Sequence, residues 1–501
     1  MEIHRIITEL QSYGTKISKL PWSRRGGAGP AEGGYVIVDN IAIAVPVNSE
    51  FVLNSPYLIK QTERGTGLFK NGRFLCHVKV VTRPKFYDFF TTDGIPYWKI
   101  ALLHGTDCLA TSVIQTCMLW DTSKRCKFCG IQISLQNGTT IKVKKPHHLA
   151  EVALKAKVLD CVSHVVLTTG SHSSPYSEIS VLAKSTKAIK ETTGLPVHVQ
   201  CLPPKDVSLL LELKNAGVDT IGLHVESFDK RVLSLIAPFK ATIGYDIYEK
   251  AWKAAVKIFG VNQVSSFIIV GLGETDESII AGCEKLSDLG VYPFLVPFRP
   301  IPDSLMANVP PPSPDRMIKL YEKVSDILKI KGITVTECKA GCVKCGACSA
   351  IKAYEKQDEL ICHPCRTDEE LASAFRIRNE VFVNEQKIFK ESDIDENDKK
   401  SIHLVAKKGR EVIGTVRVYP ENDNGHWVGG RLAVKKEFRT SGAGKLLVQE
   451  AVRYVTRQGC TKFTAHIQKS NVDFFKHLGW RPVGPMSLYF GKPHQLMEAE
   501  L

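Results

Sequence analysis

The chain contains 501 residues, of which 44% are hydrophobic and 24% are charged. At roughly 150 residues per domain, this length predicts about three domains. The composition excludes a largely disordered chain, and no run approaches the roughly 20 apolar residues that cross a bilayer. The opening residues, MEIHRIITELQSYG, lack the basic-then-apolar pattern of a secretory signal, so we expect a cytoplasmic protein without a membrane segment.

The excess of 66 basic over 52 acidic side chains leaves a formal charge of +14. This charge favours anionic partners such as nucleotides, coenzyme phosphates or RNA, without choosing among them. The 15 cysteines are more informative. Disulfides are rare in a reducing cytosol, so clustered cysteines there are more typical of metal binding or catalysis.

Residues 1–95 are expected to form an N-terminal extension of the domain that follows. Along the chain, five cysteines stand singly in apolar or strand-like stretches, where a thiol packs as a small hydrophobic group. We expect these five to be structural: Cys76, Cys161, Cys201, Cys283 and Cys460.

The first cysteine cluster lies just after an apolar segment at 98–103. Its sequence, QTCMLWDTSKRCKFCGI, places Cys117, Cys126 and Cys129 in a C-x8-C-x2-C pattern. Three thiolates suit a [4Fe–4S] cluster whose fourth iron stays open to a small molecule, whereas structural zinc usually takes four closed ligands. The pattern predicts a cluster that performs chemistry, and the alternative is a zinc knuckle completed by Cys108 or His104.

Strand-like and helical segments alternate over residues 96–335. Apolar strand-like runs occur at 164–170, 196–202, 220–227, 264–274 and 291–300, with helical periodicity between them. The repeat predicts an α/β fold in which a parallel sheet curls into a partial or full (β/α) barrel. Polar residues and glycines follow the strands, at the end of such a barrel where active sites lie.

The cysteine triplet and these strand ends resemble the radical S-adenosylmethionine (SAM) family, which often carries an aromatic residue where Phe128 stands. The resemblance implies a [4Fe–4S] cluster and SAM as cofactors. It also implies that Gly170 and Ser171 lie in the segment near the SAM amine, that Glu226 contacts SAM, and that Gly271 and Glu274 support adenine. The sequence lacks the acidic third member of the SAM-amine segment, and Phe267 stands at the first glycine of the adenine segment.

Four longer segments resemble one radical SAM family that is encoded in bacterial nitrilase-associated gene clusters. The resemblance covers about residues 1–357 and supplies a genetic context rather than a substrate. The four segments are RRGGAGPAEGG at 24–34, KFYDFFTTDGIPYWKIALLHG at 85–105, LGVYPFLVPFRPIP at 289–302 and AGCVKCGACSAI at 340–351.

A second cysteine cluster occupies residues 336–365, which we expect to be a cysteine-rich connector. Cys338, Cys342, Cys345 and Cys348 are closely spaced, and Cys362 or Cys365 is available to complete a shell. The spacing predicts a second metal site on Cys342, Cys345 and Cys348, with zinc and an iron–sulfur cluster equally favoured. The alternative is free thiols in a mobile connector.

Residues 366–501 have the pattern of a separate α/β domain. The segment Arg439, Thr440, Ser441, Gly442, Ala443 and Gly444 follows a strand that ends at Val434 and precedes a helix. Glycine-rich backbone at a helix N-terminus is suited to a pyrophosphate. Together with AHIQKSNVDFFKHLGW at 465–480, which contains Asn471, this segment resembles the GCN5-related N-acetyltransferase (GNAT) family. The resemblance implies that the loop binds the diphosphate of acetyl-CoA.

The catalytic groups of this domain are less defined. Members of the GNAT family often protonate the departing thiolate with a tyrosine, but Phe475 stands at that position. Glu380 and Glu385 are candidate bases, although charged residues on a first helix are more often only solvated. His494 resembles a histidine near the end of some relatives and is a further candidate.

These features predict a bifunctional enzyme that generates a 5′-deoxyadenosyl radical from SAM to modify a small molecule, in a nitrile-related context, and that acetylates an amine with acetyl-CoA. We expect an electron donor such as flavodoxin or ferredoxin as a partner, and no nucleic acid. One alternative resembles the elongator catalytic subunit, which joins the same two activities to modify tRNA wobble uridines. A third is a metal-scaffolded protein that binds both cofactors without consuming them.

Overall fold

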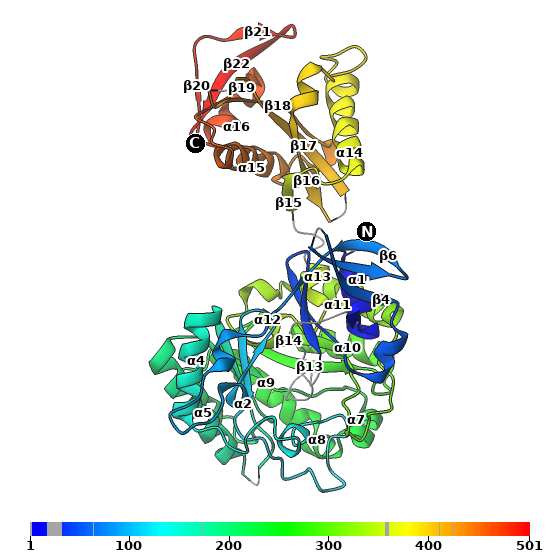
Figure 1. The fold of residues 1–501 in the computed structure, drawn as a ribbon, viewed down its shortest axis with the longest axis vertical. Coiled ribbons are helices and arrows are strands. Elements are labelled where there is room, and N and C mark those ends of the chain that lie inside the picture. The colour runs from blue at the N-terminus through cyan, green and yellow to red at the C-terminus, as the bar shows by residue number, and fades with distance from the viewer. Residues whose placement is uncertain are drawn as a thin grey trace. The chain divides into compact units, whose positions relative to one another are not determined.

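The computed structural model describes residues 3–17, 33–63, 65–172, 174–355, 360–409, 411–422 and 424–501. The chain folds into two compact units, Met1–Glu355 and Lys356–Leu501 (Figure 1). The expected extension and barrel both belong to the first unit. Most of the segment at 24–34, which carries part of the narrower family resemblance, lies outside the described residues.

An open, curved sheet forms the centre of the first unit, with the strand order β14-β13-β12-β11-β10-β9-β8. Six strands are parallel and β8 pairs antiparallel with β9 at one edge, so the barrel is the partial form of the predicted α/β fold. Its strands are buried on both faces, as parallel strands usually are. They are β8 (Leu102–His104), β9 (Cys108–Ser112), β10 (His164–Thr168), β11 (Val197–Gln200), β12 (Thr220–Gly222), β13 (Val264–Val270) and β14 (Tyr292–Pro297).

Helices connect successive strands of this sheet and pack on its outer side (Figure 1). Local signals fix several of their ends: the Asp229 carboxylate and the Thr275 hydroxyl each accept a backbone N–H at a helix start, and Gly194 and Gly332 end helices in the left-handed conformation. The helices are α4 (Pro146–Asp160), α5 (Pro175–Thr193), α6 (Leu209–Asn215), α7 (Lys230–Ile236), α8 (Pro238–Ile243), α9 (Tyr245–Phe259), α10 (Asp276–Asp288) and α11 (Pro314–Lys331).

The N-terminal residues share one continuous hydrophobic core with this sheet. Helix α1 (Ile3–Tyr13) packs on α11 and on α13 (Ile351–Glu355), which belongs to the cysteine-rich segment. Two small sheets follow, with the orders β1-β4-β5-β6 and β3-β2-β7. Their strands are β1 (Lys16–Ile17), β2 (Gly34–Val38), β3 (Ile41–Val45), β4 (Tyr57–Thr62), β5 (Gly65–Lys70), β6 (Arg73–His77) and β7 (Lys79–Val80). Short helices are α2 (Tyr97–Ile100), α3 (Ile133–Gln136) and α12 (Gly341–Cys345).

The expected connector at 336–365 divides between the two units. Helices α12 and α13 pack within the first unit, where α12 contacts β10, β11 and β14. Strand β15 (Leu360–Pro364) instead pairs antiparallel with β16 in the sheet of the second unit. Cys362 and Cys365 therefore belong to a different unit from Cys338, Cys342, Cys345 and Cys348.

The second unit is a mostly antiparallel sheet with helices packed on it, in the order β15-β16-β17-β18-β19-β22-β20, with β21 paired to β22. Strands β18 and β19 are parallel and pair only over 426–429 and 462–465. The strands are β16 (Ile402–Lys408), β17 (Glu411–Pro420), β18 (His426–Val434), β19 (Lys462–Gln468), β20 (Trp480–Pro482), β21 (Ser487–Tyr489) and β22 (Lys492–Ala499). The helices are α14 (Asp368–Asn379), α15 (Ala443–Arg457) and α16 (Val472–Lys476).

None of the helices in the described part of the chain is long and apolar enough to cross a membrane.

Candidate active sites

A cavity of about 380 Å³ opens at the carboxyl ends of the barrel strands. Thr168, Gln200 and Pro297, at the ends of β10, β11 and β14, form part of its wall. Its volume lies within the range of roughly 300–1,000 Å³ that is typical of small-molecule sites. The three expected cluster ligands, Cys117, Cys126 and Cys129, line it together with Phe128, Gly170, Ser171 and Glu226.

The loop that carries the three cysteines is held by its own backbone and by one glutamine. The Cys129 N–H donates to the Cys126 carbonyl at 3.1 Å, and the Gln132 side chain accepts a hydrogen bond of 3.0 Å from the Cys117 N–H. Burial raises the pKa of Cys126 to about 12, although nearby Lys240 opposes this. A thiol in this setting needs a strong local positive charge to ionise, which a metal supplies. The residues present therefore fit a metal cluster.

Gly170 is required by a close backbone approach. A Cβ atom at this position would lie 2.0 Å from the Thr116 carbonyl oxygen, so any side chain would clash with the segment leading to Cys117. The Gly170 N–H donates to the Ile114 carbonyl, and the Ser171 carbonyl accepts from the Met118 N–H at 2.9 Å. The glycine-rich segment thus packs directly against the cysteine loop.

Glu226 lies at the cavity wall in a strained left-handed conformation, with φ of 71°. Its Oε1 accepts a hydrogen bond of 2.6 Å from Lys240 Nζ, whereas its Oε2 is buried without a hydrogen-bond partner. Burial alone would lower the pKa of Lys240, but the Glu226 carboxylate outweighs it and holds that pKa above its usual range. The unpartnered oxygen fits a ligand donor. Sequence reasoning missed Lys240 because α8 carries no motif.

Two further cavity residues were not predicted. Glu178, on α5, accepts a hydrogen bond of 2.7 Å from the His172 N–H, and burial raises its pKa to about 7. It brings an acidic group to the cavity shared by Gly170 and Ser171, where the family pattern lacked one. His224 accepts from the Phe267 N–H through Nδ1, so a neutral ring carries its proton on Nε2, which is buried without a partner.

Gly271 and Glu274, which the resemblance placed in the adenine segment, are not among the residues that line this cavity. The Glu274 carboxylate accepts hydrogen bonds of 2.8 Å from the N–H groups of Gly271 and Leu272, and Arg316 donates to it at 3.2 Å. The Glu274 side chain therefore stabilises a turn in its own segment, which follows β13 and includes Gly271. Ile269, two residues before Gly271, lines the cavity instead.

A second, smaller cavity of about 90 Å³ contains thiols from two distant segments. Its wall includes the three cysteines of the predicted second metal site, Cys342, Cys345 and Cys348. Cys108, from β9, also lines it. Cys108 therefore does not belong with the first cysteine triplet, where a zinc knuckle had been the alternative. Cys338 lies apart from this cavity, with its thiol donating to the Ala340 carbonyl at 3.1 Å.

The single cysteines differ in setting. Cys283 is fully buried in α10 and Cys460 is buried in the second unit, as structural thiols are. Cys161 is exposed at the end of α4 with φ of 54°, and Cys201 lines the larger cavity.

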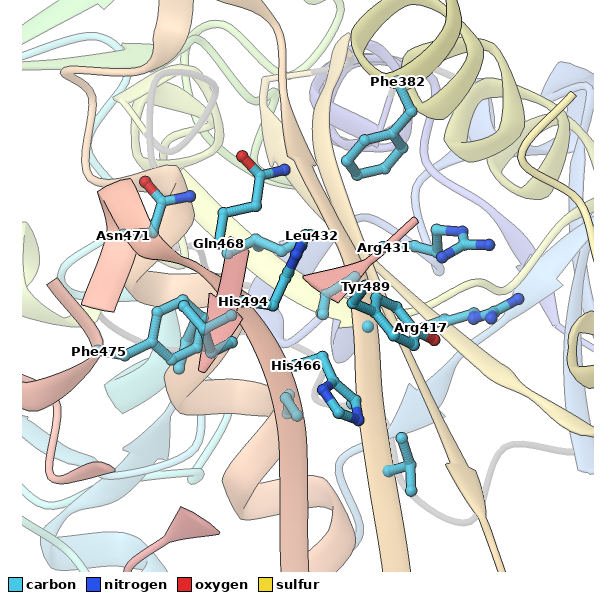
Figure 2. A pocket seen from close by; sticks show the side chains of 18 of the residues that line it. Phe382, Arg417, Arg431, Leu432, His466, Gln468, Asn471, Phe475, Tyr489 and His494 are labelled. Atoms are coloured by element: carbon cyan, nitrogen blue, oxygen red, sulfur yellow. The ribbon is translucent and has the colours of Figure 1, made fainter. Parts of the chain in front are cut away.

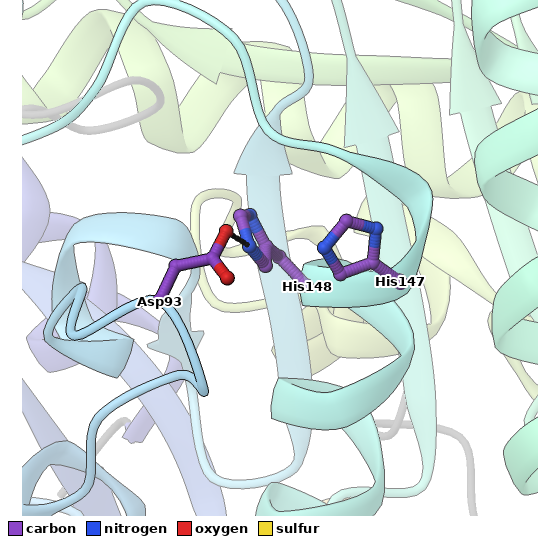
Figure 3. Close-up of side chains that lie close together, drawn as sticks. All are labelled: Asp93, His147 and His148. Carbon is purple, nitrogen blue, oxygen red and sulfur yellow. Dashed lines mark hydrogen bonds and ion pairs between the residues drawn. The ribbon is translucent and has the colours of Figure 1, made fainter.

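One compact group of metal-type donors occurs elsewhere among the described residues. Asp93, His147 and His148 place donor atoms within 4.8 Å of one another. Figure 3 shows the Asp93 carboxylate turned toward His148, to which it is joined by a hydrogen bond of 2.9 Å. Lys145 Nζ also lies 3.6 Å from the same carboxylate, so a positive charge already stands there. The hydrogen bond between His148 and Asp93 links α4 to the segment before α2.

In the second unit, a cavity of about 130 Å³ lies where β18 and β19 diverge. A bulge in β18 produces the divergence. The two steps from Thr415 to Arg417 in β17 lie opposite three steps of β18, from Ala433 to Gly430, and Arg431 in the bulge has φ of 55°. Arg431 is anchored there, with Nε donating to the Asp393 carbonyl and Nη2 to the Asp395 carboxylate, both at 3.1 Å. The wedge between the strands suits a narrow, extended ligand arm.

The predicted diphosphate loop joins β18 to α15. Gly442, with φ of 88°, is the N-cap of α15, and the Ser441 hydroxyl accepts from the Ala443 N–H at 3.3 Å. The loop from Arg439 through Thr440 to Gly444 therefore presents the positive end of a 15-residue helix. Val434, at the end of β18, accepts a hydrogen bond from Arg439 through its carbonyl.

Of the three predicted catalytic groups, only His494 lines the cavity. Glu380 and Glu385 lie outside it, and Glu385 receives two hydrogen bonds, of 2.7 and 2.6 Å, from the Arg439 guanidinium. That contact lowers the pKa of Glu385, which makes it a poor base. Glu385 is instead the counter-ion of the diphosphate loop.

His494 is oriented by the backbone. Its Nδ1 lies 2.8 Å from the Lys492 carbonyl, which can only accept, so Nδ1 carries the proton and Nε2 offers a lone pair. Figure 2 shows His494 and Tyr489 gathered between Phe475 on one side and Arg431 on the other. Tyr489, which sequence reasoning missed, stacks on His466 and lies 5.5 Å from the His494 ring. Asn471 lines the same cavity.

Two family models match the chain in separate regions. The model described as radical SAM superfamily matches residues 123–286, and the model described as acetyltransferase (GNAT) family matches residues 368–480. The chain is also 31% identical over 133 residues to the uncharacterized N-acetyltransferase YjcF of Bacillus subtilis, which covers 26% of this chain and 94% of that protein.

Other similarities are partial. The chain is 31% identical over 135 residues to bacteriochlorophyllide c C-7(1)-hydroxylase of Chlorobaculum limnaeum, and it spans only 33% of that protein and 26% of its own length. Among solved structures, Escherichia coli ElaA is 23% identical, with a TM-score of 0.27, and the match covers 28% of this chain and 100% of that one.

Proposed function

The chain carries a radical SAM domain and, in its second unit, belongs to the GNAT acetyltransferase family, and from this premise we propose that it is a bifunctional enzyme acting on small molecules. The first unit would use SAM to activate a C–H bond, and the second would acetylate an amine with acetyl-CoA. The observation that carries the proposal is the convergence of Cys117, Cys126, Cys129 and Glu226 on one cavity.

In the first unit, Cys117, Cys126 and Cys129 would hold a [4Fe–4S] cluster. When bound, the reduced cluster and SAM together supply a 5′-deoxyadenosyl radical. The chain's own residues would bind the ligand and shield it from water. Glu226 offers an unpartnered carboxylate oxygen to a donor of the ligand, and Lys240 donates a hydrogen bond to the other oxygen of that carboxylate. The apolar walls formed by Phe267, Ile269 and neighbouring residues exclude water from the reacting centre.

In the second unit, the loop at 439–444 would bind the diphosphate of acetyl-CoA, and the wedge between β18 and β19 would receive its pantetheine arm. His494 Nε2 would remove a proton from the attacking amine, directly or through water, because Nδ1 faces the Lys492 carbonyl and the residue lines the cavity. Tyr489 has a hydroxyl that can protonate the departing thiolate, in place of the group absent at Phe475.

The substrate of the radical step is proposed to be a small molecule because the cavity has the volume of a small-molecule site. The family resemblance of residues 1–357 favours nitrile-related metabolism. A flavodoxin or ferredoxin in the cytosol would supply the electron, and the basic charge would serve the anionic cofactors. The elongator-like alternative gains no support from the family matches, which identify the two domains and no tRNA-binding feature.

The test is product analysis of anaerobically reconstituted protein given dithionite, labelled SAM and labelled acetyl-CoA. We expect 5′-deoxyadenosine from the wild type and none from Cys126→Ala. Cys283→Ala, which removes a buried thiol of α10 away from the cavity, is the matched control and should retain the yield. Equal yields from Cys126→Ala and the wild type would reject the radical function.

A further inference from the structure

The smaller thiol cavity brings together residues from two segments of the first unit that are far apart in the sequence. Cys108 begins β9, whereas Cys342, Cys345 and Cys348 lie on and just after α12. Helix α12 contacts β10, β11 and β14, so it closes the barrel interior. The Cys108 thiol hydrogen bonds to Cys345, which joins the two segments directly.

The cavity is too small for an organic substrate. Its volume of about 90 Å³ falls well below the roughly 300–1,000 Å³ of small-molecule sites. Its wall nevertheless holds four thiols, and a Cβ atom added at Gly105 would lie 3.0 Å from Cys345 Sγ. A small space with four thiols in its wall suits an inorganic core.

The thiol spacing argues against a single zinc ion. Tetrahedral zinc with Zn–S bonds of about 2.3 Å holds its sulfurs roughly 3.8 Å from one another. Among the described residues, three metal-type donor atoms that all lie within 4.8 Å of one another come from Asp93, His147 and His148. No three of the four cavity thiols, which all belong to the described part of the chain, form such a group, so these thiols lie farther apart than a single zinc ion requires. An iron–sulfur cluster distributes its cysteines over separate irons and keeps them farther apart.

Neighbouring groups also match a cluster. Gln200 Nε2 donates a hydrogen bond of 3.3 Å to Cys342 Sγ, and hydrogen bonds to sulfur are one means by which proteins tune such clusters. The thiol loop is braced at Ala347, whose carbonyl accepts from the Ala44 N–H at 2.8 Å and from Gln11 Nε2 at 3.0 Å. The N-terminal extension thus fixes the loop between Cys345 and Cys348.

We propose that Cys108, Cys342, Cys345 and Cys348 bind a second iron–sulfur cluster, which forms the floor of the SAM cavity. Cys348, Gln200 and Phe267 line both cavities, so the two sites share a wall. Four protein thiolates close the shell of this second cluster. It therefore cannot take SAM, in contrast to the cluster on the cysteine triplet. The proposal adds a site to the proposed function without depending on SAM cleavage.

The experiment measures iron and acid-labile sulfide in full-length protein reconstituted anaerobically. Cys126→Ala removes the first site and is expected to retain about half of the wild-type iron. The double variant Cys126→Ala/Cys108→Ala should lose most of the remainder. The matched control is Cys126→Ala/Cys338→Ala, because Cys338 belongs to the same cysteine run but does not line the cavity. It should keep its iron.

A spectroscopic readout on Cys126→Ala alone covers the case in which a Cys108 variant fails to fold. Its reduced electron paramagnetic resonance signal should be present and unchanged on adding SAM, because a closed shell has no open iron. Absence of iron in Cys126→Ala, zinc in its place, a SAM-sensitive signal, or equal iron loss in the Cys338 control would each overturn the proposal. Since no readout requires deoxyadenosine formation, failure of the radical function would leave these results unchanged.

Discussion

Lys240 donates a hydrogen bond of 2.6 Å to Glu226, and both side chains are nearly buried, with 12% and 9% of their surfaces exposed. The pair lies in the wall of the cavity that also contains the cysteine triplet. Breaking a buried ion pair on one side leaves an uncompensated charge, which costs more than the pair itself contributes.

Lys240→Met should therefore lower the unfolding free energy of the first unit by about 3 kcal/mol. The double variant Lys240→Met/Glu226→Leu, which removes both charges, should recover most of that loss. Denaturant titration of the three proteins measures this. If the double variant is as unstable as the single variant, the charge pairing does not explain the effect.

Glu178 should make stability depend on pH. Burial raises its pKa from 4.5 to about 7, so folding favours the protonated carboxyl. The stabilisation is present below pH 4.5 and is lost as the pH rises through about 7. Glu178→Gln, which stays neutral, should thus exceed the wild type by about 3 kcal/mol at pH 8 and match it near pH 4. Unfolding at both pH values measures the difference, and a constant offset would contradict it.

Glu385 and Arg439 should affect acetyl-CoA binding rather than catalysis. Glu385 competes with the coenzyme diphosphate for the Arg439 guanidinium, and both side chains are more than a third exposed, so the pair is weak. Glu385→Gln should lower KM for acetyl-CoA about two- to fivefold with kcat unchanged, and Arg439→Gln should raise KM. A large fall in kcat for Glu385→Gln would instead make Glu385 the base.

Tyr489→Phe should lower kcat for acetyl transfer about 100-fold, the lower end of what a general acid contributes. The phenylalanine ring preserves the stacking on His466, so KM should change little. Tyr454→Phe is the control, because Tyr454 packs on Trp427 outside the cavity. Steady-state kinetics of the three proteins measure the difference in kcat. A kcat for Tyr489→Phe equal to that of the wild type would remove Tyr489 from this role.

The parts of the sites that lie close together in sequence were predictable. Two groups are each encoded in one short segment: the triplet Cys117, Cys126 and Cys129, and the loop at 439–444. Their spacing and the family resemblances therefore predicted which residues would lie together. The βα alternation likewise predicted the parallel sheet, because the period of the apolar residues changes from strand to helix.

The parts that depend on chain closure were not predictable. Cys108 joins Cys345 only because α12 folds back under the barrel, and nothing local to either residue indicates this. Glu274 fits a family pattern, yet its carboxylate accepts hydrogen bonds from the backbone N–H groups of the turn at 271–272. Glu385 was one of two candidate bases, whereas the fold places Arg439 against it.

The bracing of Ala347 by Gln11 and Ala44 has a consequence for biosynthesis. Chains emerge from the ribosome N-terminus first, and domains fold as units. The brace and Cys108 are therefore made early, whereas the three partner thiols appear only as the first unit nears completion. A nascent chain that stops before residue 342 already contains the triplet at 117–129, but it has no floor beneath it. Such a chain also lacks Cys348, so the wall of the larger cavity is completed only by the last segment of the first unit.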